Sequence, residues 1–364
     1  MKIAVLDTYY PDFLKSVEIG DDGYETLLQR LLAKQFGTAD FYSRNLRALG
    51  WEAIDIIANC YLIQQHWAME NNEPSRELED IALAQIKAFA PDVVFVQDLS
   101  FFSVSTLHRL RGSYLLVAQH SCPWAGDERV REFHLIFTSF PHYVPRIEAL
   151  GVRAVYNPLA FEFEAIRKLV SKQWERRYTG YPDALKRIHD CVFIGGVGNP
   201  SHWTYGMQVL ETVAREIPTF KWWGYGVETL PADSLLRQKY QGQAFGIDMY
   251  SILLQSKIAL CRHGEVAEGY TNAMRVFEST GCGALMLTEE SKNIWDLFSA
   301  NEIATYLTPV QAVQKIQYYL ANEGERAYIA AKGQARCLRD HTYTQRMQVV
   351  SEVLRECLVS AIQN

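Results

Sequence analysis

The sequence lacks an excess of charge of either sign, because 36 lysines and arginines stand against 42 aspartates and glutamates, for a net charge of −6. A chain so balanced carries no basic footprint for nucleic acid, and we expect no nucleic-acid partner. It also lacks long apolar runs, and no stretch approaches the roughly 18 apolar residues that a membrane-spanning helix needs. The opening residues, MKIAVLDTYY, hold only a short apolar run before Asp7, which predicts a first β-strand rather than a signal peptide.

Paired cysteines and metal-binding motifs are missing as well. The seven cysteines show no CxxC spacing, and several lie in apolar segments such as DCVFIGG and IALC. This pattern is typical of reduced core thiols in a cytoplasmic protein and argues against a disulfide framework. Neither HExxH nor a carboxylate cluster at metal-ligating spacing occurs, so we expect no metal site and no cofactor. The GxSxG elbow of α/β-hydrolases is also missing.

What the 364 residues do contain is a repeated alternation of short apolar runs and helical patterns. Continuous apolar strands separated by helices indicate parallel sheets covered on both faces. The runs form two series, which predicts an α/β protein with two doubly wound, Rossmann-like domains. The expected strands are 3–6, 52–57, 93–96, 114–119, 135–138 and 154–156 in the first series, and 191–194, 220–223, 257–260 and 284–287 in the second.

The turn Gly180-Tyr181-Pro182 follows a basic segment and predicts the domain boundary. We therefore place the first domain at residues 1–175 and the second at 176–341. A last helix is expected at about residues 342–362, because its apolar residues recur at helical spacing. We expect this helix to pack back on the first domain.

Open parallel sheets bind ligands at the carboxyl ends of their strands, so the residues after each strand are the candidates for a site. The first strand of the second series is followed by Gly195, Gly196 and Gly198, a turn whose backbone N–H groups suit a phosphate. Neither GK[ST] nor GxGxxG completes it, and a structural turn is an equal alternative. Tyr225 follows the next strand between two glycines, where it can stack on a nucleobase; a tight turn is again the alternative.

Histidine and arginine follow two other strands. His120 comes after the strand 114–119, where it can act as a general base or bind a reacting sugar or phosphate. A buried structural histidine is the alternative. Arg262 and His263 come after the strand 257–260, where Arg262 can neutralise a diphosphate that His263 contacts. Both fit solvent-exposed loop residues equally well.

The segment TNAMRVFESTGCGALMLT, residues 271–288, predicts a helix, a glycine-spaced turn and an apolar strand. Asn272, Arg275 and Glu278 are spaced by three residues and so share one broad face of that helix. An amide, a cation and a carboxylate near a helix start can grip a phosphorylated, hydroxyl-rich ligand. An ordinary amphipathic helix with a surface ion pair is the alternative.

Three blocks between residues 250 and 346 resemble a known family: SKIALCRHG, NAMRVFESTGCGALMLTEE and HTYTQR. They resemble the C-terminal half of the CgeB-like (spore maturation protein) glycosyltransferases, and the second block also resembles the donor-site helix of the wider retaining GT-B transferases. The resemblance implies two Rossmann-like domains facing across a cleft. It implies that Glu278 binds the ribose of a nucleotide sugar, and it matches His120 to an active-site histidine. At Tyr270 the chain departs from the wider GT-B family, which often carries a second glutamate there, in contact with the donor sugar.

The resemblance implies a metal-independent, retaining glycosyltransferase that uses a nucleotide-diphosphate sugar. The second domain would hold the nucleotide, and the first would bring the acceptor, which stays open among a glycan, a lipid, a protein and a small molecule. One alternative is a nucleotide-sugar epimerase of the same architecture, for which Asp98 and Glu265 are candidate acid/base groups. Another is a catalytically silent nucleotide-sugar-binding or scaffold protein, which the departure at Tyr270 favours.

Overall fold

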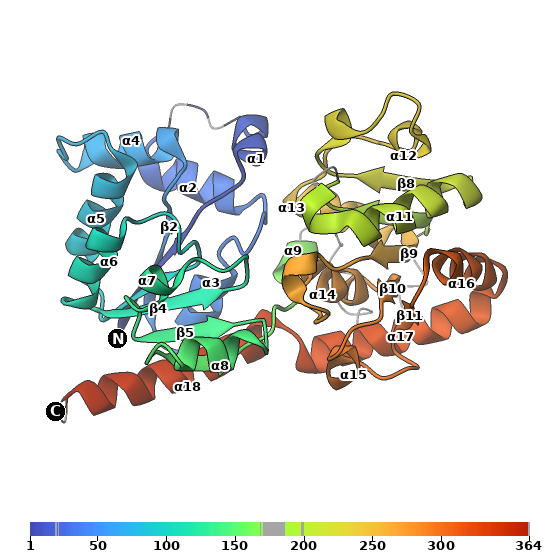
Figure 1. Ribbon diagram of the computed structural model, residues 1–364. Coiled ribbons are helices and arrows are strands. Elements are labelled where there is room, and N and C mark those ends of the chain that lie inside the picture. Colours follow the sequence, from blue (N-terminus) through green and yellow to red (C-terminus); the bar gives the residue numbers. More distant parts are fainter. Residues whose placement is uncertain (19, 21, 168, 170–185, 198–199, 363–364) are drawn as a thin grey trace. The chain divides into compact units, whose positions relative to one another are not determined.

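The computed structural model describes residues 1–364 except 19, 21, 168, 170–185, 198–199 and 363–364. The chain forms two compact units, each with its own sheet (Figure 1). The first unit comprises Met1–Pro158 together with Tyr343–Asn364, and the second comprises Leu159–Thr342. The turn at residues 180–182, where the sequence places a domain boundary, lies outside the described residues.

The first unit is built on a six-stranded parallel sheet with the order β2-β1-β3-β4-β5-β6. Its central strands are continuous apolar runs, and all four residues of β3 are buried. Such runs form strands that are covered on both faces, since alternating polar residues would have to be buried there. The strands are β1 (Lys2–Asp7), β2 (Glu52–Ile57), β3 (Val93–Val96), β4 (Leu115–His120), β5 (Leu135–Thr138) and β6 (Arg153–Tyr156).

Helices flank this sheet, and the last helix of the chain is one of them. Helix α18 (Tyr343–Ile362) packs against α3 (Phe41–Ala48), and the Trp51 indole N–H donates to the Ser351 hydroxyl at 2.8 Å. The Arg346 Nε donates to the Pro158 carbonyl at 2.8 Å. The other helices are α1 (Pro11–Ser16), α2 (Tyr24–Leu32), α4 (Tyr61–Glu70), α5 (Leu78–Phe89), α6 (Val104–Arg111), α7 (Asp127–Val130) and α8 (Tyr143–Glu148).

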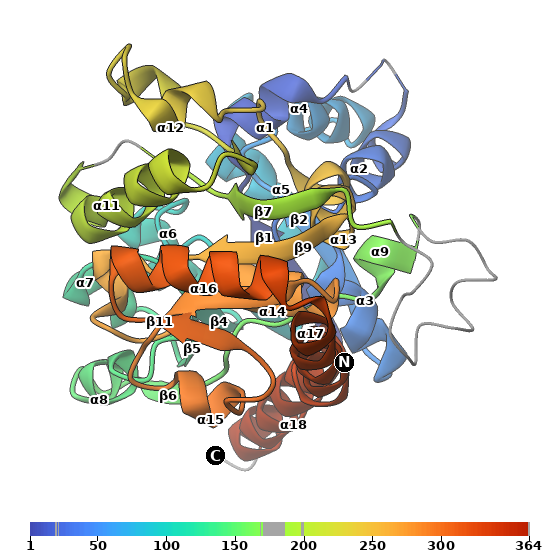
Figure 2. The same ribbon diagram turned by 90° about the vertical axis from the view of Figure 1, so that its right-hand side faces the viewer.

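The second unit is built on a five-stranded parallel sheet with the order β11-β10-β9-β7-β8 (Figure 2). The strands are β7 (His189–Ile194), β8 (Phe220–Trp223), β9 (Ser256–Cys261), β10 (Leu285–Glu289) and β11 (Ala304–Tyr306). The helices are α9 (Glu164–Arg167), α11 (Pro200–Glu216), α12 (Leu235–Gln238), α13 (Gly246–Leu254), α14 (Met274–Gly281), α15 (Ile294–Leu297), α16 (Pro309–Ala321) and α17 (Glu323–Asp340), with short 3₁₀ turns η1 (Val227–Thr229) and η2 (Glu265–Ala267).

The chain enters and leaves the second unit at one place. The Phe161 N–H donates to the His341 carbonyl at 2.9 Å, and Phe161 forms an isolated parallel bridge with Thr342. The Phe161 ring lies against Gly281 at the end of α14, where an added Cβ would come within 2.4 Å of it. Gly281 is therefore a packing glycine, because any larger side chain would displace this ring.

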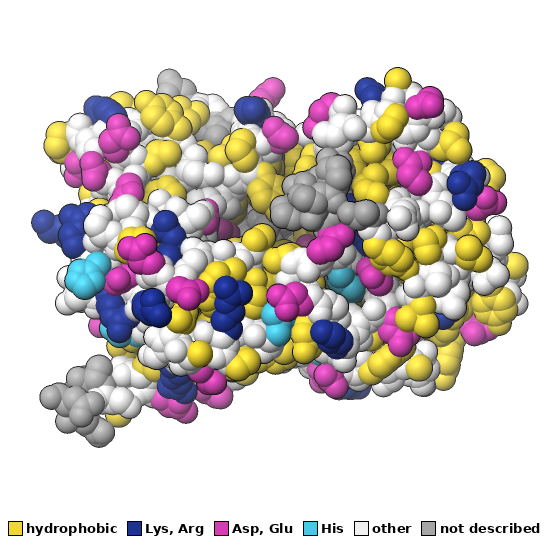
Figure 3. All heavy atoms as spheres, in the orientation of Figure 1, with side chains coloured by type: hydrophobic (Ala, Val, Ile, Leu, Met, Phe, Trp, Pro, Cys, Tyr) yellow, Lys and Arg dark blue, Asp and Glu magenta, His cyan; other side chains and the backbone are white. Residues whose placement is uncertain are grey.

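The expected α/β fold with two helix-covered parallel sheets is confirmed. Among the described residues, no helix has both the length and the apolar character to span a bilayer. On the face seen in Figure 3, basic and acidic side chains are interspersed over both units.

Candidate functional site

The carboxyl edge of the second sheet is formed by loops that pair beyond the ends of β7 and β8. The Gly195 N–H donates to the Trp223 carbonyl at 3.0 Å, and the Val197 N–H donates to the Tyr225 carbonyl at 2.9 Å. The two loops thus continue the strand pairing past the sheet. This pairing fixes their backbones and holds the turn at the edge where parallel sheets bind ligands.

Glycine is required in these loops by their close packing. An added Cβ at Gly196 would lie 2.4 Å from the half-buried Tyr225 ring. At Gly224, which has a φ of +149°, a Cβ would lie 1.9 Å from the Gly195 carbonyl oxygen. The structural-turn interpretation therefore accounts for these glycines by itself, and phosphate binding stays a prediction. Gly198 lies outside the described residues.

Arg262 joins β9 to the glycine turn. Its side chain is 8% exposed, and its Nη2 donates to the Gly196 carbonyl at 2.6 Å. The guanidinium lies 5.4 Å from the centre of the Phe193 ring. The side chain crosses Gly206 of α11, where a Cβ would lie 2.5 Å from its Cδ. Burial lowers the pKa of Arg262 to about 10, which leaves it a cation at neutral pH. It is not a solvent-exposed loop residue.

His263 faces the end of the neighbouring strand β10. Its Nε2 lies 3.2 Å from the Thr288 hydroxyl, and its backbone N–H donates to the Glu289 carboxylate at 3.3 Å. Burial lowers the pKa of His263 to about 4, so the ring is neutral near pH 7. Burial also raises the pKa of Glu289. The sequence analysis missed Glu289, although it ends an apolar run in the same way as the other candidates.

Arg275 and Glu278 lie together on α14. The Arg275 Nη1 is 2.7 Å from the Glu278 Oε2, and the Arg275 Nε donates to the Ile194 carbonyl at 3.2 Å, one residue before the glycine turn. The Tyr250 hydroxyl donates to the Glu278 Oε1 at 3.3 Å. Glu278 is only 4% exposed, so this pair is not a surface ion pair. Through Arg275, the Glu278 carboxylate is linked to the end of β7.

Asn272 does not share the helix with these two residues, which corrects the expectation. Helix α14 begins at Met274, and Asn272 lies in the preceding loop. The Thr271 N–H donates to the Asn293 Oδ1 at 2.7 Å, and its hydroxyl lies 2.5 Å from that of Ser291. These contacts to the loop after β10 hold Thr271 outside the helix, so tertiary bonding overrides the local helical pattern.

Tyr270, where the chain departs from the family, makes an aromatic–cation contact. The Lys292 ammonium lies 4.8 Å from the centre of the Tyr270 ring. Glu265 begins the η2 turn, and Glu268 follows it in a left-handed conformation with a φ of +49°. Neither glutamate stands at the position of the missing one.

His120 is the last residue of β4 and is buried by residues of its own unit. The Ala125 N–H donates to its Nε2 at 3.4 Å, and the Cys122 thiol lies 3.5 Å from its Nδ1. The rings of Trp124 and Tyr143 pack at 5.5 and 5.1 Å from its centre. Burial lowers its pKa to about 4. This environment favours the structural alternative, while the catalytic role stays a prediction.

A polar cluster lies where the first sheet reverses its strand order, beside β1 and β3, and the sequence analysis named only its Asp98 as a candidate. The Thr8 hydroxyl donates to the Asp98 Oδ2 at 2.6 Å, and the Thr38 hydroxyl donates to the Asp7 Oδ2 at 3.1 Å. The Thr38 hydroxyl also lies 3.0 Å from the Gln97 Oε1. Burial raises the pKa of Asp7 to about 7. Such reversal points are the preferred ligand crevices of open α/β sheets.

The structure brings most of the predicted residues of the second unit to one edge. No group of three or more His, Cys, Asp or Glu side chains within the described part of the chain is arranged to hold a metal ion. The residues that meet at the carboxyl edge or are bonded to it are Gly195, Gly196, Tyr225, Arg262, His263, Arg275 and Glu278.

A family model described as glycosyl transferase-like matches residues 207–352. This match covers most of the second unit, including the sites at Arg262 and Glu278. No curated protein matches the chain.

Several solved glycosyltransferases share the fold over nearly the whole chain. Sucrose-phosphate synthase from Thermosynechococcus elongatus is 11% identical, with a TM-score of 0.60 over 99% of each chain. HepE from Anabaena, in complex with UDP-glucose, is 13% identical, with a TM-score of 0.55 over 98% of this chain and 100% of HepE. AviGT4, involved in avilamycin A biosynthesis, is 13% identical, with a TM-score of 0.56 over 99% and 98% of the two chains.

Identities this low show a shared fold rather than a shared substrate. The family match concerns the unit in which the predicted residues meet, and the fold extends the likeness over both units. Together they show a glycosyl transferase-like domain over residues 207–352 and, over both units, the fold of solved GT-B glycosyltransferases.

Proposed function

We propose that the carboxyl edge of the second sheet binds the donor, a nucleotide-diphosphate sugar. The observation that carries this proposal is the buried guanidinium of Arg262, which is held against the glycine turn by its bond to the Gly196 carbonyl. Burying a cation destabilises the fold unless other interactions compensate, because removing its charge from water costs several kcal/mol. A diphosphate at this edge would add negative charge near the guanidinium, beyond that of Glu265 and Glu289.

Arg262 also suits the chemistry of sugar transfer. When the bond from the anomeric carbon to the diphosphate breaks, negative charge accumulates on the leaving phosphate oxygens. A fixed guanidinium stabilises that charge without reorganising, which is worth most in a desolvated site. Arg262 supplies this charge from the protein, and we therefore propose transfer without a metal ion. Backbone N–H groups of the glycine turn would share the task.

Glu278 fits two roles in the donor site. The resemblance assigns it the ribose hydroxyls, and its burial beside Tyr250 and Arg275 supports a further role in holding Arg275 against the Ile194 carbonyl. In both roles its negative charge is needed, because a neutral amide would neither accept as strongly nor pair with the arginine. We propose that it positions Arg275 and accepts from the ribose.

We propose that the first unit binds the acceptor. Two carboxylates, Asp7 and Asp98, lie at the point where its strand order reverses, and carboxylates accept hydrogen bonds from hydroxyl groups. A retaining outcome rests on the resemblance alone. The pKa of Asp7, raised to about 7 by burial, favours a base that removes the acceptor proton, as inversion requires. The anomeric configuration of the first product, read by NMR, decides between the two.

The finer assignments follow from the same resemblance. We propose that the chain is a CgeB-like enzyme of the cytoplasm. UDP-sugars are the donors to test first, since HepE was solved with UDP-glucose. The epimerase alternative predicts turnover of the donor without an acceptor, and the silent alternative predicts binding without turnover.

The donor proposal is tested by calorimetric titration of UDP-, GDP-, ADP- and dTDP-sugars into wild type and Arg262→Met. We expect one nucleotide class to bind wild type and to lose at least tenfold in affinity in the variant, the value of about one charged hydrogen bond. EDTA is expected to leave turnover unchanged. Equal affinity in a folded Arg262→Met protein contradicts the donor site, and loss of turnover in EDTA that Mg²⁺ restores contradicts transfer without a metal.

A further inference from the structure

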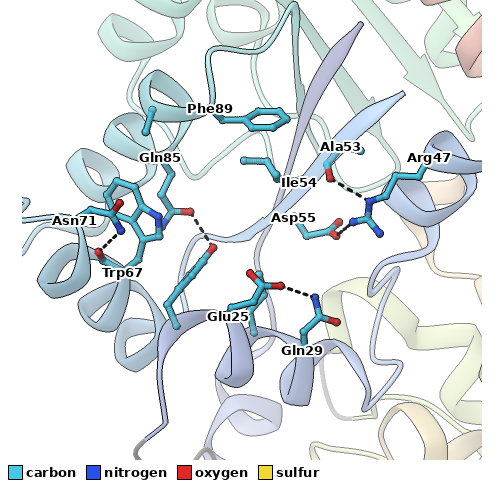
Figure 4. Close-up of a pocket in the computed structure, with 13 residues that line it drawn as sticks. Glu25, Gln29, Arg47, Ala53, Ile54, Asp55, Trp67, Asn71, Gln85 and Phe89 are labelled. Atoms are coloured by element: carbon cyan, nitrogen blue, oxygen red, sulfur yellow. Dashed lines mark hydrogen bonds and ion pairs between the residues drawn. The ribbon is translucent and has the colours of Figure 1, made fainter. Parts of the chain in front are cut away.

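A separate cavity of about 570 Å³ lies in the first unit, beside the edge strand β2 (Figure 4). Its lining comes from β2 and from helices α2, α3, α4 and α5, and none of the candidate residues discussed above lines it. Its volume falls within the range of about 300–1,000 Å³ that is typical of small-molecule sites. The hollow is open to solvent on one side, so a small molecule can reach it.

Asp55 places an unsatisfied acceptor in the wall of this cavity. Its side chain is 4% exposed, and its Oδ2 accepts from the Ser43 hydroxyl at 2.5 Å and from the Arg47 Nη2 at 3.1 Å. Its Oδ1 is buried and has no hydrogen-bond partner in the described part of the chain. Burial raises the pKa of Asp55 to about 7. A buried acceptor left unpaired costs about 1–3 kcal/mol, which a ligand hydroxyl would recover.

The opposite wall is a chain of fixed amide groups. The Tyr24 hydroxyl donates to the Gln85 Oε1 at 3.4 Å, the Gln85 Nε2 donates to the Gln64 Oε1, and the Gln64 Nε2 donates to the Ile57 carbonyl at 3.0 Å. This chain fixes which atoms of Gln85 face the cavity. Figure 4 shows Gln85 and Trp67 across the cavity from Asp55 and Arg47.

Two aromatic side chains supply flat apolar surfaces to this cavity: Trp67, on the same side as Gln85, and Phe89. The Trp67 indole N–H makes no hydrogen bond to a residue that the structure describes, which leaves it as a donor for a ligand. Glu25 and Gln29 form a third side, where the Gln29 Nε2 donates to the Glu25 Oε1 at 3.0 Å. Aromatic faces combined with carboxylate and amide groups match a ligand that has apolar faces and a rim of hydroxyls.

This chemistry distinguishes between classes of ligand. A wholly apolar ligand would leave the Asp55 Oδ1 unpaired. A phosphate or nucleotide would face two carboxylates, Asp55 and Glu25, with Arg47 as the single cation of the lining. A pyranose ring stacks on an aromatic face through its C–H groups and donates its hydroxyls to carboxylate and amide oxygens.

We infer that this cavity binds one pyranose unit of a carbohydrate, separately from the donor site. The occupant is a sugar residue lying against Trp67, with a hydroxyl donated to Asp55. In a glycosyltransferase, such a site anchors a glycan that serves as acceptor or leaves as product. The inference goes beyond the proposed function, since it needs neither the donor assignment nor the role of any residue of the second unit.

Ligand-observed NMR titrations of the full chain with D-glucose, D-galactose and N-acetylglucosamine test this inference. We expect at least one sugar to bind wild type, and Trp67→Ala and Asp55→Asn to weaken it by about tenfold or more, the value of one buried hydrogen bond or stacking contact. Asp55 is buried, and its substitution can prevent folding. Asn71→Ala, at the exposed rim of the cavity, is therefore a second polar variant. Trp295→Ala is the matched control, since Trp295 is a 45% exposed tryptophan of α15 in the other unit.

Two further arms separate this site from the donor site. Arg262→Met should bind the free sugar like wild type, and Trp67→Ala should bind UDP-glucose like wild type. Absence of sugar binding by wild type overturns the inference, as does binding that the folded cavity variants leave unchanged. Binding of adenine or tryptamine in place of the sugars would also overturn it, because the cavity would then be a site for a flat aromatic amine.

Discussion

Gly206→Ala is the sharpest perturbation of the donor site, because it adds one carbon where Arg262 crosses α11. That carbon would lie 2.5 Å from the Arg262 Cδ and 2.6 Å from its Nη1. The side chain is 8% exposed and cannot simply swing into solvent. We therefore expect its bond to the Gly196 carbonyl to be lost, at about 1.5–3 kcal/mol for a hydrogen bond to a charged group. The displaced guanidinium would also lose its charged hydrogen bond to the diphosphate, again about 1.5–3 kcal/mol, so UDP-glucose should bind about 10- to 150-fold more weakly.

The same substitution has two opposing effects on the stability of the fold. Alanine stabilises a helix interior by about 0.5–1 kcal/mol relative to glycine, which partly offsets the lost hydrogen bond. Gly324→Ala in α17 is the matched control, since a Cβ there meets nothing within 4 Å. Titration calorimetry gives the affinity, and urea unfolding gives the stability. If Gly206→Ala binds UDP-glucose as tightly as wild type and is at least as stable, the position of the Arg262 side chain does not depend on the space beside Gly206. The reasoning then fails.

The remaining predictions concern Glu278 and His120. Glu278→Gln should weaken the binding of UDP-glucose by about 1.5–3 kcal/mol in calorimetry, because the negative charge beside Arg275 is lost. Unchanged affinity in a folded variant would reject both proposed roles of Glu278. If His120 is catalytic, His120→Ala should lower turnover by about 10²–10⁴-fold with little change in donor affinity or thermal stability. A loss of several kcal/mol of stability with specific activity retained would instead make it structural and move the assignment to His263. The pKa of His120 is about 4 when folded and about 6.5 when unfolded, so its contribution to stability is present above pH 6.5 and is lost as the pH falls through 4. Urea unfolding at pH 7 and 4.5 should show wild type losing roughly 2–3 kcal/mol more than His120→Gln, which lacks this titration; equal losses would contradict the buried, neutral ring.

The strands were predictable because each is an apolar run that a helix-covered parallel sheet requires. Strand β11 was missed, since three residues, Ala304–Tyr306, are too short a run to stand out. The start of α14 was misplaced because the hydrogen bonds of Thr271 to residues far along the chain outweigh the local helical pattern.

The site was predictable in kind but not in geometry. Position after a strand identified Arg262 and His263 as candidates, because the carboxyl ends of parallel strands gather at one edge. That Arg262 is buried and crosses Gly206 depends on a helix elsewhere in the sequence, which no local pattern contains. The same holds for Asp55, whose unpaired oxygen results from how α3 covers β2.

The division of the first unit between both ends of the chain has a consequence for its synthesis. Proteins emerge from the ribosome N-terminus first, and domains generally fold as units while they emerge. The first 158 residues appear early, but α18 packs on α3 and joins Trp51 to Ser351 only after residue 343 has been made. Until then, the side of α3 that α18 covers is exposed on the nascent chain. The first unit is therefore begun first and finished last, and the ribosome must make the whole of the second unit in between.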